Sequence, residues 1–125
     1  MKTLTDLEAW KKARELRNEV SALVRSFPPE EKYRLTDQII RASRSVGANI
    51  AEGYGRFHYI DSSKFFVNAR GSASETIEHL YVALDERYID QVAFEKLRTL
   101  CEDSMKLING YISFLRNQAS IKPKT

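Results

Sequence analysis

The sequence predicts an all-α protein, most simply an antiparallel up-down-up-down four-helix bundle. Apolar residues recur at steps of three and four in four separate segments, which is the period of an amphipathic helix. Gly and Pro are scarce, with five and three residues, and Pro28, Pro29, Gly53 and Gly55 fall where those segments meet. The nearest strand candidate, residues 65–67, is too short and lies within a helical period. Four amphipathic helices joined by short links favour a bundle.

The first helix is predicted over residues 6–26. Thr5 and Glu8 have the spacing of a capping box, in which each side chain satisfies a free amide of the first turn. The Pro28-Pro29 pair ends the helix, because proline disfavours helical geometry in the residue before it. Pro29 and the two glutamates after it favour a short helical turn. The apolar stripe of the first helix comprises Leu7, Trp10, Ala13, Leu16, Val20, Leu23, Val24 and Phe27.

The second and third helices are predicted over residues 35–54 and 61–87, with Asp61 as the N-cap of the third. Small residues in the middle of the third helix, around Gly71, allow another helix to approach closely at some cost in helix propensity. The apolar stripe of the second helix comprises Ile39, Ala42, Val46, Ile50 and Gly53. That of the third comprises Phe66, Ala69, Ala73, Ile77, Leu80 and Leu84.

The fourth helix is predicted over residues 90–117, with Asp90 as its cap. We interpret residues 118–125, which contain Pro123 and two lysines, as a flexible basic tail. Residues 1–117 then form the bundle. The apolar stripe of the fourth helix comprises Phe94, Leu97, Cys101, Met105, Ile108, Ile112 and Leu115.

Polar residues line up on a second face of the second and third helices, and we call this set the polar seam. Their steps of three and four place them on one side of each helix. We expect the seam to be a buried network that fixes helix register, because buried polar groups tend to be paired. Ligand binding is the less favoured alternative, and the third is that the seam faces water. The members are Gln38, Arg41, Ser45, Asn49, Glu52, Asn68, Ser72 and Glu75.

Composition sets limits on function. The net charge of +3 and the pI near 9.0 suit an acidic partner or nucleic acid, but are too small to argue for either alone. Cys101 is the only cysteine, so an intramolecular disulfide and a Cys-based zinc site are excluded. No apolar run of membrane-spanning length and no signal-peptide pattern occurs. We therefore expect a cytoplasmic protein that does not associate with a membrane.

The sequence predicts no enzyme, no cofactor and no metal. A carboxylate-bridged metal site needs Glu-x-x-His pairs, and His79 instead follows Glu75 by four. The glycines at 53 and 55 lack the Lys-Ser/Thr of a phosphate-binding loop. Cys101 lies on the apolar stripe of its helix, which favours an inert thiol. No serine is singled out as a nucleophile.

Two stretches suit nucleic acid. Basic residues of the first helix, among them Lys11, Arg14 and Arg17, can form a cationic face, although nearby glutamates make a self-paired face equally plausible. Residues 54–59 mix rings with Arg56 and can stack on unpaired bases, but we favour an aromatic plug over the bundle end. Surplus rings on the third helix, such as Phe65, suggest a homo-oligomer interface.

These residues resemble a known family of small bacterial four-helix bundle proteins, the 23S rRNA intervening sequence proteins, also called S23 ribosomal proteins. The resemblance runs from Leu7-Glu8-Ala9-Trp10 to the region of Ile112. Its most specific part is Arg41-Ala42, Ser45, then residues 48–53 (ANIAEG) and Gly55-Arg56. One departure is Arg44, where the family more often has a small or apolar residue.

The resemblance implies a ring-like homopentamer without catalytic residues. It also implies genes inside rRNA insertions, and relatives that bind nucleic acid and a reverse transcriptase through a basic surface. Our first hypothesis is therefore an oligomeric bundle that binds RNA or DNA. The second is an oligomeric adaptor for a protein partner such as a reverse transcriptase. The candidate nucleic-acid-binding residues are Lys11, Arg14, Arg17, Arg41, Arg44 and Arg56.

Overall fold

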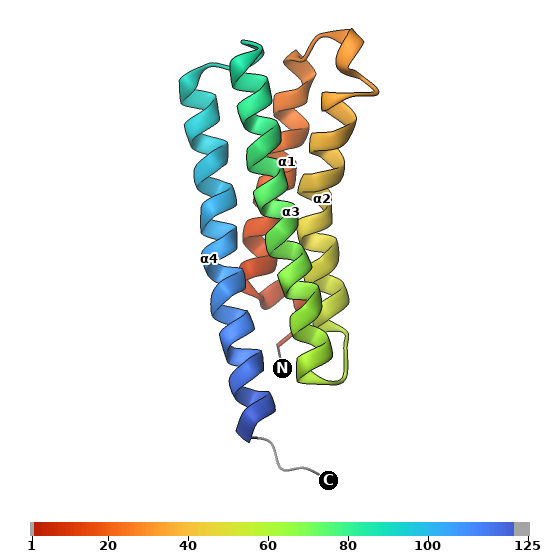
Figure 1. The fold of residues 1–125 in the computed structure, drawn as a ribbon, viewed down its shortest axis with the longest axis vertical. Helices are drawn as coiled ribbons and strands as arrows, with labels where there is room; N and C mark the ends of the chain where they lie inside the picture. Colours follow the sequence, from red (N-terminus) through yellow and green to blue (C-terminus); the bar gives the residue numbers. More distant parts are fainter. Residues whose placement is uncertain (1, 122–125) are drawn as a thin grey trace.

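The computed structural model describes residues 2–121 and shows four long antiparallel helices (Figure 1). They are α1 (Glu8–Leu23), α2 (Leu35–Tyr54), α3 (Tyr59–Asp85) and α4 (Gln91–Ile121). Short 3-10 turns lie at Leu4–Asp6, Val24–Ser26 and Pro29–Glu31. The predicted all-α four-helix bundle is confirmed, and α2 has the predicted bounds. None of the helices within the described range is long and apolar enough to cross a membrane.

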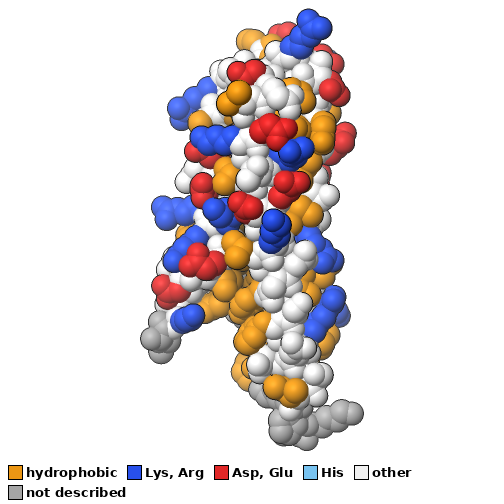
Figure 2. Space-filling view, turned by 90° about the vertical axis from the view of Figure 1, so that its left-hand side faces the viewer, with side chains coloured by type: hydrophobic (Ala, Val, Ile, Leu, Met, Phe, Trp, Pro, Cys, Tyr) orange, Lys and Arg blue, Asp and Glu red, His pale blue; other side chains and the backbone are white. Residues whose placement is uncertain are grey.

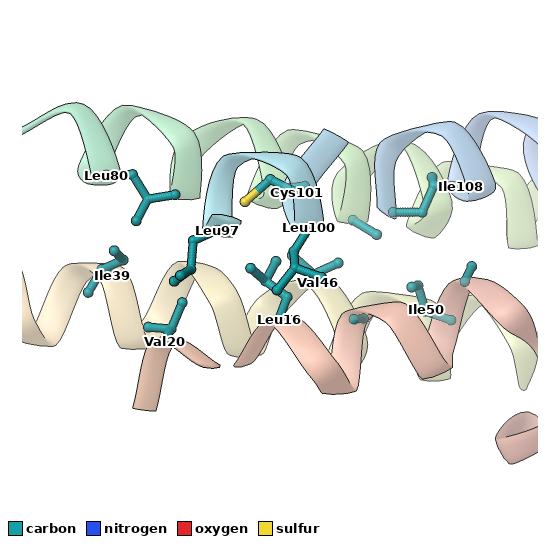
Figure 3. Close-up of a cluster of buried hydrophobic side chains, with 14 of the residues drawn as sticks. Leu16, Val20, Ile39, Val46, Ile50, Leu80, Leu97, Leu100, Cys101 and Ile108 are labelled. Atoms are coloured by element: carbon teal, nitrogen blue, oxygen red, sulfur yellow. The ribbon is translucent and has the colours of Figure 1, made fainter. Parts of the chain in front are cut away.

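Each helix packs against two others. α1 contacts α2 and α4, and α3 contacts the same two helices, so the four close into a bundle (Figure 1). Facing aliphatic side chains from all four helices fill its centre (Figure 3). Burying one such side chain contributes about 1.5–3 kcal/mol. The labelled members are Leu16 and Val20 of α1, Ile39, Val46 and Ile50 of α2, Leu80 of α3, and Leu97, Leu100, Cys101 and Ile108 of α4.

Cys101 belongs to this core. Its side chain is fully buried, and burial raises the pKa of the thiol to about 12. Because the thiolate is the reactive form, this residue is an inert part of the packing, as its place on the apolar stripe predicts.

The ends of α2 and α3 meet closely at Gly53. The buried Ser62 hydroxyl donates a hydrogen bond of 2.6 Å to the Gly53 carbonyl. A Cβ at Gly53 would lie 2.9 Å from two ring carbons of Phe66 and 2.9 Å from the Ser62 carbonyl oxygen. Only glycine fits this contact without displacing its neighbours.

The loops at the opposite end are tied together. Tyr88, in the α3–α4 connection, donates a 2.7 Å hydrogen bond to the Glu31 carboxylate, which also accepts the Leu35 amide at 3.2 Å. These two hydrogen bonds lower the pKa of Glu31, and the bond to Glu31 raises the pKa of Tyr88 to about 12. Beside Tyr88, Arg87 closes α3 with a φ of 64°, the left-handed conformation usual for glycine.

Several helix ends differ from prediction. The first capping arrangement joins Thr3 to Asp6, whose carboxylate accepts the Thr3 amide at 2.9 Å, rather than Thr5 to Glu8. Asp61 is not an N-cap, because α3 already begins at Tyr59. The Asp90 cap is present, accepting the Ala93 amide at 2.8 Å.

The fourth helix is longer than predicted. α4 continues to Ile121, so the interpretation of residues 118–121 as a flexible tail is wrong. The sequence from 118 to 121 contains neither Gly nor Pro, the residues that most often end a helix. The rest of the predicted tail, residues 122–125, lies outside the described residues.

Candidate functional site

A groove of about 330 Å³ lies between α1 and α2. Trp10 and Arg17 of α1 line one side, and α2 supplies Arg44 beside three small residues, Gly47, Ala48 and Ala51. Two of the sequence-predicted arginines, Arg17 and Arg44, thus come from different helices to one surface. We call this surface the Trp10 groove.

The spacing on α1 explains the position of the ring beside the cations. Trp10, Arg14 and Arg17 are separated by four and three residues, so they lie along one face of the helix. The guanidinium carbons of Arg14 and Arg17 lie 5.7 and 5.9 Å from the centroid of the Trp10 ring. Each such cation–π contact is worth roughly 0.5–1 kcal/mol at an exposed site. The ring therefore holds Arg17 at the groove and Arg14 beside it in the unbound protein.

The acidic residues of α1 do not neutralise these arginines. Within residues 2–121, Arg14, Arg17 and Arg44 form no ion pair, whereas the glutamates of α1 pair with lysines. The alternative of a self-paired face therefore describes the lysines of α1 and not its arginines. The pairs are Lys11 with Glu8 at 3.3 Å, Lys12 with Glu15 at 3.3 Å, and Lys96 of α4 with Glu19 at 3.1 Å.

Arg17 reaches across to α2 beside Gly47. A Cβ at Gly47 would lie 3.5 Å from Arg17 Nη1, an ordinary van der Waals distance, so this guanidinium lies next to the surface of α2. Sequence reasoning placed Trp10 in the core stripe and gave no role to Gly47. The signal for Trp10 was its spacing from Arg14 and Arg17.

The structure does not bring the other predicted cations to this groove. Arg41 is exposed and pairs with Asp37 at 3.2 Å. Arg56 follows the C-terminal end of α2 and does not line the groove. It lies 3.6 Å from Glu52, with its guanidinium carbon 4.5 Å from the centroid of the Phe65 ring. Lys11 is held by Glu8, as described above. Three of the six candidates, Arg14, Arg17 and Arg44, therefore gather around Trp10.

The polar seam is shorter than expected. Asn49 donates a 2.9 Å hydrogen bond to the Ser45 hydroxyl, and Ser72 of α3 donates one of 3.0 Å to the same oxygen. These three half-buried residues link α2 to α3. The outer members, Gln38, Arg41, Glu52, Asn68 and Glu75, are exposed, so the expectation of one buried network across all eight is wrong.

The acidic side chains at the edges of the polar seam pair with residues four positions later in the chain. Glu52 pairs with Arg56, and Glu75 lies 3.3 Å from His79, one turn further along α3. The described residues contain no group of three or more His, Cys, Asp or Glu that could hold a metal ion. Of the ring-rich connector, Phe57 is 93% exposed and His58 is exposed, whereas Tyr54 and Tyr59 are half-buried and Tyr59 packs against the core, so only part of the connector matches the expected plug.

A second, apolar groove of about 480 Å³ lies between the N-terminal segment, the end of α2 and α4. Leu7 and Tyr54 line one side, and Leu107, Tyr111 and Phe114 of α4 line the other. Hydrophobic side chains gather on the lower half of the face shown in Figure 2, while acidic and basic side chains alternate above. Leu107 and Phe114 are 36% and 47% exposed, so both leave apolar surface in contact with solvent along this groove.

Comparisons with known proteins agree with this architecture. A family model described as 23S rRNA-intervening sequence protein matches residues 5–110. A crystal structure from Bacteroides thetaiotaomicron, of a protein with unknown function from the S23 ribosomal protein family, is similar with a TM-score of 0.77 and 25% identity. The alignment covers 83% of this chain and 97% of that one. No curated protein matches the chain.

Proposed function

Because the chain belongs to the 23S rRNA-intervening sequence protein family, we propose that it is a non-enzymatic homo-oligomeric bundle that binds RNA or DNA through a basic surface. One observation carries the proposal: Arg14, Arg17 and Arg44 gather around Trp10 without an ion pair among the described residues. Cations that form no ion pair within residues 2–121 are available to phosphate.

The chemistry of arginine suits this role. A guanidinium presents a planar fork of N–H donors that matches two phosphate oxygens. Such contacts position a nucleic acid without reading its sequence. If one subunit neutralises about three phosphates, log affinity falls against log salt with a slope of about −2 on single strands and about −3 on duplex.

Binding of fluorescent RNA and DNA at increasing salt tests the proposal. We expect the double variant Arg17→Gln, Arg44→Gln to bind more weakly and to flatten the salt slope by roughly one to two. Arg41→Gln is the matched control, because Arg41 is paired with Asp37 and lies outside the groove. Absence of binding by the wild-type protein at low salt removes the proposal.

The apolar groove supports self-assembly. Association of two copies would remove Leu107 and Phe114 from water, and exposed apolar patches on one protein commonly mark such contacts. Light scattering after gel filtration should show an oligomer that Leu107→Glu dissociates. Val92→Glu is the control, because Val92 is 79% exposed and lies outside this groove. A wild-type monomer at micromolar concentration contradicts the oligomer.

The same groove supports a second candidate function, an adaptor for a protein partner such as a reverse transcriptase. Here the apolar surface contacts the partner and the arginines have no role in binding nucleic acid. A nuclease-treated pull-down from the native host, in which wild type but not Leu107→Glu recovers one protein, favours the adaptor.

A further inference from the structure

The Trp10 groove combines two features that bare phosphate binding does not need. One is an aromatic ring on its wall, and the other is a floor of small residues. Phosphate contacts require only the arginines and would be served equally by cations on any exposed helix face. The aromatic ring and the small residues of the groove therefore fit a ligand with a flat apolar part.

The ring is held in place. Trp10 is half-buried, packs against the core, and lies beside the guanidinium groups of Arg14 and Arg17. An aromatic surface that is fixed in advance loses little conformational entropy when another ring stacks on it. Stacking of a base on an aromatic side chain is sequence-tolerant, because every base has a π-face.

The floor leaves space beside the ring. Between Trp10 and Arg44, α2 contributes only Gly47, Ala48 and Ala51, none of which extends beyond Cβ. A volume of about 330 Å³ lies at the lower end of the range for small-ligand sites, about 300–1,000 Å³. Arg17 and Arg44 flank the space from opposite helices, where phosphates on either side of an inserted base would lie.

We infer that the Trp10 groove takes one unpaired base of single-stranded RNA or DNA, stacked against Trp10, with the adjoining phosphates on Arg17 and Arg44. The inference rests on the proposed function, since it names the form of nucleic acid that this surface selects. Duplex bases are already stacked and paired, so they reach Trp10 only after unstacking. Duplex binds through its phosphates alone.

Trp10 is the only tryptophan of the chain, so its fluorescence reports directly on the groove. Three probes of equal length separate the contributions: a single-stranded oligonucleotide, the same strand as a duplex, and an abasic strand that keeps the phosphates. We expect the single strand alone to quench Trp10 fluorescence. It should bind roughly 5- to 100-fold more tightly than the abasic strand, which corresponds to stacking of one base.

Two variants separate stacking from folding. Trp10→Leu should lower single-strand affinity to that of the abasic strand measured with the same variant, because both strands then contact only the arginines. Because Trp10 also packs on the core, Ala48→Leu provides a second test: Ala48 is exposed, and leucine there fills the floor while Trp10 stays. It should abolish quenching and the preference for single strands. Ala22→Leu, at an exposed alanine of α1 outside the groove, is the matched control.

The outcomes are distinct. Equal affinity for the three probes without a change in Trp10 fluorescence overturns the inference and leaves the proposed function standing. Tighter binding of duplex than of single strand also overturns it. If none of the probes binds, the proposed function itself fails, and the inference fails with it.

Discussion

Replacing Gly53 by alanine tests the close contact between α2 and α3. The added Cβ would lie 2.9 Å from Phe66 ring carbons, whereas carbon atoms pack best at about 3.5–4.0 Å. Phe66 is fully buried and its ring centroid lies 4.6 Å from that of Tyr111, so it has little room to retreat. The helices must separate, which also strains the 2.6 Å hydrogen bond from Ser62.

The magnitude follows from three contributions. Overpacking of a core costs about 1–3 kcal/mol. Weakening the buried Ser62 hydrogen bond costs about 1 kcal/mol more. Alanine returns at most about 1 kcal/mol through its higher helix propensity. We expect Gly53→Ala to lower the free energy of unfolding by about 2 kcal/mol.

Gly71 provides a control of opposite sign. It lies in the interior of α3, and a Cβ there would meet no atom within 4 Å. Gly71→Ala should therefore raise stability by about 1 kcal/mol through propensity alone. Thermal unfolding at one fixed protein concentration measures both, with roughly 3–6 °C per kcal/mol for a domain of this size. A Gly53→Ala protein as stable as Gly71→Ala would refute the packing argument.

Three further predictions concern the buried Ser104 hydroxyl, the left-handed backbone of Arg87 and the lowered pKa of Glu31. Ser104 is fully buried and its hydroxyl has no hydrogen-bond partner within residues 2–121, so Ser104→Ala should raise stability by about 1 kcal/mol in urea unfolding; a loss would show a missed partner. Arg87 has a φ of 64°, so Arg87→Gly should stabilise by about 1 kcal/mol in thermal unfolding, and Arg87→Val should destabilise. The lowered pKa of Glu31 implies stability that is present above its usual value of 4.5 and is lost as pH falls through the folded value. Tyr88→Phe should therefore destabilise more at pH 7 than at pH 3 in urea titrations, and an equal loss at both would contradict the linkage.

Apolar periodicity predicted the helices because burial of one face dominates helix stability in a bundle. It predicted α2 at about residues 35–54, which agrees with the structure, and Gly53 and Gly55 mark the end. Apolar periodicity was less exact at helix ends that polar side chains cap. Thr3 and Thr5 each have an acid three residues later, and the structure forms the capping arrangement at Thr3.

Polar spacing was a weaker guide to the site. A helix face defined by steps of three and four is broad enough to include both half-buried Ser45 and exposed Glu52. Ser45 and Ser72 meet because their side chains are short, while longer acids reach water. Charge pattern alone also could not show that Glu19 pairs with Lys96 of α4, which leaves Arg17 free of a carboxylate.

Because Cys101 carries the only thiol of the chain and is fully buried, its chemical modification reports opening of the bundle. A maleimide or disulfide reagent can modify Cys101 only in molecules whose fourth helix has come away from the rest, because the folded state shields the thiol and keeps it protonated. Because the chain has no second cysteine, each modified molecule corresponds to one opening that exposed Cys101. The rate of Cys101 labelling, measured with and without an oligonucleotide, would therefore show how far a bound strand slows the opening of the bundle.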